Sequence, residues 1–118
     1  MTGVPAVDLD EFRSAMRASG IEEIVMPMLT LFRQEAPKGI ASLTAALEAR
    51  DLTAASRAAH SLKSSAANIR AKELAELLLQ LELAAQGGDA ALTDSLFGRV
   101  KVAYDAAIEC LAAAGVET

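Results

Sequence analysis

The chain has 118 residues, the size of one domain, and its hydrophobic and charged fractions of 53% and 23% are typical of a globular protein. Its net charge of −5 argues against nucleic acid as the main partner. One cysteine and one histidine exclude an internal disulfide and disfavour a zinc site, and no apolar stretch approaches the roughly 20 residues of a membrane span. We therefore expect a cytoplasmic, cofactor-free protein that binds no metal, nucleic acid or membrane.

The first three predicted elements are helices bounded by caps and prolines. The residues Asp8 and Glu11 have the spacing of a capping box, and the helix that they begin ends near 19–20. An apolar pattern over 24–32 predicts a second helix, which either begins near Pro27 or kinks there. Pro37 indicates a fresh start, with a third helix running to about residue 49.

Three longer helices follow. Asp51 caps a fourth helix with apolar residues spaced alternately three and four apart up to Ile69. A fifth covers 71–86, and the turn "QGGD" ends with Asp89 as the cap of a last helix over 90–113. The core seam predicted for that last helix includes Leu92, Leu96, Val100 and either Cys110 or Leu111.

This order predicts an all-α fold. The composition supports it, because alanine and leucine dominate and runs of β-branched residues are missing. Short connections make neighbouring helices antiparallel, so helices three to six form an up-down four-helix bundle with two additional N-terminal helices. We expect one domain over 1–118, with a core at about 8–113.

The single histidine, His60, lies on the fourth helix and points away from its core seam. At about 100° per residue it lies roughly 130° from the middle of the seam, so we expect the ring in solvent. Most of its neighbours on that face are small enough for another macromolecule to reach the ring. These candidate partner-binding residues are Thr53, Ser56, Arg57, Ser64 and Ala67.

Two charged residues are placed to assist the imidazole. Lys63 lies one turn along the same helix and has an amino group that can bind an anion held on the ring. Glu82 lies beside the seam of the fifth helix. If the two helices pack antiparallel, Glu82 accepts a hydrogen bond from His60 Nδ1–H and leaves Nε2 as a nucleophile.

The histidine helix is also the basic part of an acidic chain. Residues 49–72 hold five basic side chains and one acidic one, whereas the remainder holds six and fifteen. This asymmetry favours an acidic partner at this face.

The stretch "HSLKSSAANI", followed by "LAELLLQLE", resembles the signature of histidine-containing phosphotransfer (HPt) domains of multistep two-component phosphorelays. The resemblance implies that His60 accepts a phosphoryl group, that Lys63 supports it, that small Ser64 admits the partner and that Glu82 bonds the histidine. It implies a monomeric carrier without catalytic activity of its own. Its partners would be receiver domains of response regulators or of a hybrid histidine kinase, and the receiver would supply Mg²⁺.

One departure concerns Arg70, where many members of that family have a glycine that ends the histidine helix. A left-handed cap there costs energy for a residue other than glycine. The turn after the histidine helix is therefore the part of the resemblance that Arg70 puts in question.

Three alternatives remain open. The chain could be a helical-bundle interaction module that binds a kinase or receiver without being phosphorylated, in which case binding does not depend on His60. It could be a kinase dimerisation domain, but no proline follows the histidine and no nucleotide motif is present. An enzyme in its own right is least supported, because the sequence shows no second histidine or paired-carboxylate constellation.

Cys110, Met26, Met28 and Phe32 are expected in the core, with Met28 or Phe32 also able to surface beside the histidine helix.

Overall fold

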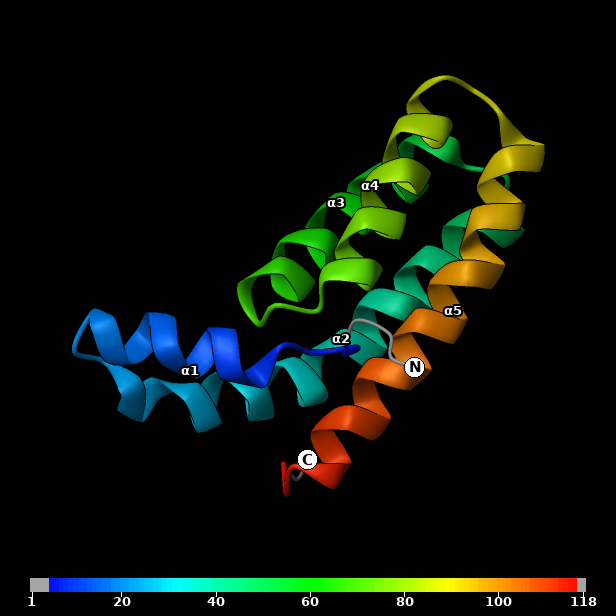
Figure 1. Cartoon of the computed structure of the whole chain (residues 1–118). Coiled ribbons are helices and arrows are strands. Elements are labelled where there is room, and N and C mark those ends of the chain that lie inside the picture. Colours follow the sequence, from blue (N-terminus) through cyan, green and yellow to red (C-terminus); the bar gives the residue numbers. More distant parts are fainter. Residues whose placement is uncertain (1–4, 117–118) are drawn as a thin grey trace.

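The computed structural model describes residues 5–116, and within them every regular element is helical. The five α-helices are α1 (Leu9–Ala18), α2 (Val25–Glu48), α3 (Leu52–Asn68), α4 (Lys72–Gln86) and α5 (Ala90–Ala113), with a short 3₁₀ helix η1 (Glu22–Ile24) before α2. Consecutive helices from α2 to α5 run in alternating directions, and α1 lies against the N-terminal half of α2 (Figure 1). The all-α prediction is confirmed.

The predicted number of helices is wrong, because the expected second and third helices are one. Helix α2 continues through Pro37, and its first turn contains Pro27, whose missing amide would have no helical partner there in any case. A proline in a helix interior costs about 3 kcal/mol. Burial on both sides of Pro37 offsets that cost, since each fully buried large apolar side chain contributes about 1.5–3 kcal/mol. The buried residues of α2 are Val25, Leu29, Phe32, Ala36, Leu43, Ala46 and Leu47.

Aspartate caps begin three of the helices, as the sequence predicts. The side chains of Asp8, Asp51 and Asp89 each accept a hydrogen bond from the backbone amide three residues on, at 3.0 Å. The capping box at Asp8 is only half formed. The Asp8 amide donates instead to the Arg70 carbonyl at 3.0 Å, which ties the start of α1 to the turn between α3 and α4.

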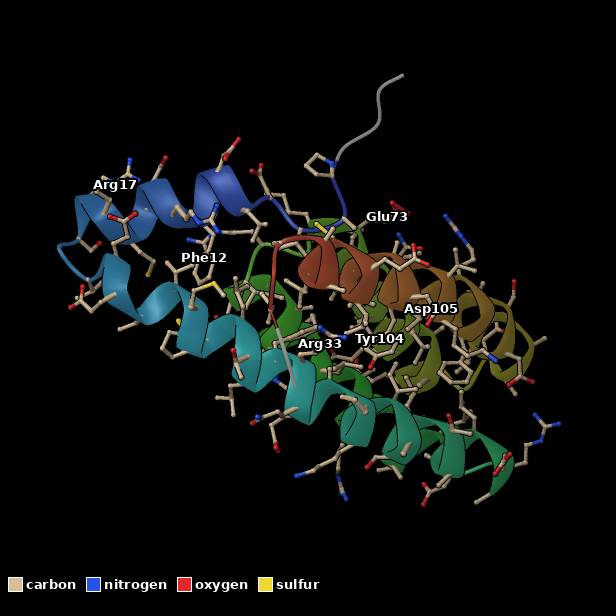
Figure 2. All side chains as sticks on the ribbon, turned by 90° about the horizontal axis from the view of Figure 1, so that it is seen from below. Phe12, Arg17, Arg33, Glu73, Tyr104 and Asp105 are labelled. Carbon is tan, nitrogen blue, oxygen red and sulfur yellow. The ribbon has the colours of Figure 1, made fainter. Side chains whose placement is uncertain are left out.

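The core lies between α2, α3, α4 and α5 and consists mainly of leucine and alanine. Helices α2 and α3 approach closely at Gly39, where a Cβ would lie 3.1 Å from Leu62 Cδ1. Helix α1 contributes Phe12, which is fully buried and points from α1 toward α2 in Figure 2. Val7 and Val116, just outside the expected core range of 8–113, are buried as well.

Three apolar residues lie outside the core positions predicted for them. Met26 and Leu92 are 41% and 47% exposed, and Thr93 takes the buried position beside Leu92. Cys110 is only partly buried, and Leu111, the other residue expected at this seam position, is fully buried. In each case a residue next to it in the sequence is the buried one.

A polar contact links α2 to the segment that follows α5. Arg33 on α2 and Tyr104 on α5 lie near each other, and Arg33 donates a hydrogen bond to the Val116 carbonyl (Figure 2). Partial burial raises the pKa of Tyr104, with a smaller effect of Asp105 in the same direction.

No helix among the described residues is long and apolar enough to cross a membrane.

Candidate functional site at the α3–α4 seam

Helix α3 presents His60 on its outer side. The inner side packs through Ala55, Ala59, Leu62 and Ala66, all of them buried. His60 follows Ala59 directly, and a step of about 100° turns it away from the buried side of the helix. Its side chain is 62% exposed, which agrees with the orientation expected from the helical pattern.

Glu82 on α4 bonds both the histidine and the lysine of α3. Its Oε2 lies 3.0 Å from His60 Nδ1, and its Oε1 accepts a hydrogen bond from Lys63 Nζ at 2.8 Å. The Glu82 side chain is 11% exposed and that of Lys63 23%. The structure therefore brings together the three residues that the sequence singled out. The carboxylate of Glu82 in this contact is largely shielded from bulk water.

The charge of Glu82 fixes the proton on the ring. The hydrogen bond from Lys63, aided by the one from His60, lowers the pKa of Glu82 below its usual value, although burial acts in the opposite direction. An ionised carboxylate can only accept hydrogen bonds, so the contact requires the proton to be on His60 Nδ1. In the neutral form of the ring, the lone pair is then on Nε2.

The residues around the ring are mostly small and accessible. Thr53, Arg57, Ser64 and Ala67 are exposed and Ser56 is half-buried. The hydroxyl of Ser64 donates to the His60 backbone carbonyl at 3.2 Å, so its side chain stays close to the helix. A protein surface can approach Nε2 across this face without displacing a large side chain.

The positive charge of this region is smaller than its sequence suggests. Arg50 pairs with Asp94 at 3.0 Å, Lys63 with Glu82, and Lys72 with Glu11 at 2.6 Å. Arg70 lies over the Phe12 ring at 5.5 Å. Of the five basic residues in 49–72, Arg57 is the one close to His60 in sequence that makes no ion pair within the described residues.

Arg70 does adopt the left-handed conformation that the sequence put in question, with φ of 66°. The Ala71 amide donates to the Ala66 carbonyl at 2.9 Å, which closes the C-terminal cap of α3. Three further contacts hold the residue in place: the hydrogen bond from Asp8, the Phe12 ring, and a bond from its own guanidinium to the Asn68 carbonyl at 3.0 Å. The arginine is thus accommodated without loss of the turn.

A groove of about 390 Å³ lies between α2 and α3, and its α3 lining begins at Ser61, the residue after His60. Met28 and Phe32 line it, as does Leu31, which is 57% exposed. Met28 and Phe32 are the residues expected to be able to surface here, whereas Leu31 belongs to the apolar pattern of 24–32 and is not singled out by it. The apolar pattern of 24–32 is too continuous to show which of its residues faces outward.

The described residues contain no group of three or more His, Cys, Asp or Glu side chains that could hold a metal ion.

Comparison with known proteins agrees with the geometry. The sequence profile of the Hpt domain family matches residues 27–113. The fold is similar to the crystal structure of histidine-containing phosphotransfer protein B (HptB) from Pseudomonas aeruginosa PAO1, with a TM-score of 0.80, 26% sequence identity, and coverage of 92% of this chain and 93% of that one. A search of curated proteins gave no match. The chain therefore belongs to the Hpt domain family, the family of histidine-containing phosphotransfer domains.

Proposed function

We propose that the chain carries a phosphoryl group on His60 Nε2, received from the phosphorylated aspartate of one receiver domain and passed to the aspartate of another. The observation that supports this most directly is the exposed imidazole whose Nδ1 is bound to the Glu82 carboxylate. That contact leaves an uncovered lone pair at Nε2, which is the nucleophile that the reaction needs.

The transfer step follows from this arrangement. The Nε2 lone pair attacks phosphorus, a nitrogen–phosphorus bond forms, and the bond from phosphorus to the aspartyl oxygen breaks, releasing the receiver's carboxylate. The role of the chain is to hold the nucleophile in line and in the correct tautomer. Mg²⁺ and the acidic pocket belong to the receiver, so the chain is a carrier rather than an enzyme in its own right.

Lys63 is the group on this chain that can neutralise the incoming phosphoryl. Its amino group is bound to Glu82 on one side, and its side chain remains 23% exposed. An ammonium has three donors, so Lys63 can keep the contact with Glu82 while donating another hydrogen bond to a phosphoryl oxygen.

The receiver would dock over the outer face of α3. Thr53, Ser56, Ser64 and Ala67 would allow close approach, and Arg57 would attract the acidic surface of the receiver. The groove beside Met28 and Leu31 would take an apolar side chain. One such face serves donor and acceptor in turn, and we propose that the carrier acts as a monomer.

The test is labelling by receiver domains from the same genome, charged with acetyl phosphate. The wild-type chain should acquire a label that is acid-labile and base-stable, and His60→Gln should acquire none while keeping its helical circular dichroism. Gln80→Ala, an exposed change on α4, should label like wild type. Binding of receivers with no label on wild type would instead support the interaction module, and full labelling of His60→Gln would refute the proposed phosphoacceptor.

A further inference from the structure

We propose that Glu82 holds the Nδ1 proton on the ring after His60 is phosphorylated, and thereby keeps the phosphoryl group transferable. This inference rests on the proposed phosphoacceptor role of His60. It assigns to Glu82 a second role, in the donor half of the relay, besides fixing the tautomer of the acceptor.

The chemistry makes the Nδ1 proton decisive. When neutral His60 forms its bond to phosphorus through Nε2 and keeps the proton on Nδ1, the ring becomes a cation. When an aspartate later attacks phosphorus, the nitrogen–phosphorus bond breaks, its electron pair returns to Nε2, and the ring leaves as neutral imidazole. If the Nδ1 proton is lost first, the ring must leave as an imidazolate anion, which is a much poorer leaving group.

The geometry gives Glu82 direct control of this proton. Oε2 lies 3.0 Å from Nδ1, and the carboxylate is 11% exposed, so solvent screens its attraction for a cationic ring only weakly. Lys63 bonds the other oxygen, Oε1, and does not compete for Oε2. The arrangement resembles the buried carboxylate that stabilises an imidazolium in a Ser-His-Asp triad.

Other charged groups near the ring are more distant or already paired. On α3, Arg57 is exposed one turn before His60, and on α4 the exposed Glu76 accepts from Gln80 Nε2. On α2, Glu35 lines the neighbouring groove and forms an exposed pair with Lys38. Among residues 5–116, Glu82 is the titratable side chain bonded to the imidazole.

The experiment measures the protonation of the His60 ring directly. The chain is phosphorylated with phosphoramidate, a small donor that needs no receiver, and the pH at which the ring loses its Nδ1 proton is measured by ¹⁵N NMR. Because the chain has one histidine, every ring signal belongs to His60. An opposite charge in contact shifts such a midpoint by about 1 pH unit or more, so Glu82→Gln should lose the proton at a pH lower by at least that amount. Glu76→Gln, with the same charge change on the same helix, should match wild type.

The rate at which phosphohistidine loses its phosphoryl group to water should follow the same titration. In Glu82→Gln the fall in that rate with rising pH should begin about 1 unit lower than in wild type. Equal midpoints in wild type and Glu82→Gln would overturn the inference. If Glu82→Gln does not fold, wild type is compared with free phosphohistidine, and an equal midpoint there overturns it as well.

The two proposals fail separately. A shifted midpoint with no phosphoryl exchange between the chain and any receiver would refute the relay function and leave the role of Glu82 toward the ring intact. Exchange with receivers and an unshifted midpoint would do the reverse.

Discussion

The two sides of α3 serve different purposes: one packs in the core and the other presents the histidine. The inner side, with Ala59 and Leu62, is buried and apolar and determines how α3 packs on its neighbours. The outer side, with His60 and Ser64, is exposed and bonded to few groups. Neighbouring residues thus serve packing and chemistry separately, because one step along a helix turns a side chain by about 100°. Changes on one side should therefore leave the function of the other largely intact.

The largest effect is expected from truncation on the inner side. Leu62 is 4% exposed and lies against Gly39, so Leu62→Ala removes buried methyl groups and leaves a cavity. The free energy of unfolding should fall by about 2–5 kcal/mol. Leu83→Ala, at a leucine that is 56% exposed, should change it by about 0.5 kcal/mol or less.

Urea unfolding measures both values, and phosphoramidate labelling of the folded Leu62→Ala chain measures the chemistry. We expect His60 to label at the wild-type rate under conditions where the variant is folded. A slow rate in the folded variant would show that the packing of α3 and the reactivity of the ring are coupled, and the separation of the two sides would not hold.

A smaller effect is expected from added bulk on the outer side. Ser64 is exposed beside the ring, and Ser64→Leu would push a docked receiver away from Nε2. Misplacement of reacting groups by about 1 Å can cost up to a hundredfold in rate, so transfer from a phosphorylated receiver should slow by about tenfold or more. Stability should change little.

The control for Ser64→Leu is labelling with a small phosphoryl donor. Phosphoramidate is small enough to pass the leucine, and its labelling rate should stay within about twofold of wild type. Equal slowing with both donors would mean that Ser64 acts on the ring itself, for example through its hydrogen bond to the His60 carbonyl.

The sequence predicted these two sides well because both depend on local rules. The aspartate caps, the seam of α3 and the outward direction of His60 follow from spacing along one helix. The contact of Glu82 with both His60 and Lys63 required only that α3 and α4 be antiparallel, which their short connection imposes. Both helices have a clear apolar period, and α3 begins at the aspartate cap Asp51.

The errors arise where distant parts of the chain decide the outcome. Pro37 predicts a break by local rules, yet α2 continues because buried residues on either side of it pack on other helices. The Asp8 amide bonds Arg70 rather than Glu11, and Lys63 and Lys72 are neutralised by carboxylates of other elements. None of these partners can be found by a pattern within a single helix, and together they reduce the free positive charge around His60.

The weakest effect should come from the positive charge that remains at this face. Arg57 is exposed one turn before His60. Arg50, which also precedes His60 in the chain, is paired with Asp94. Removing the free charge by Arg57→Gln should slow association with a receiver a few-fold at low salt and hardly at all at high salt, because long-range attraction is screened there. The matched change Arg50→Gln alters the net charge by the same amount, but it lies before the start of α3, more than two helical turns from His60, so it should slow association less. Stopped-flow association rates over a salt series measure both variants. An equal salt dependence for Arg50→Gln would show that net charge, rather than the unpaired arginine beside the histidine, guides the partner to the outer side of α3.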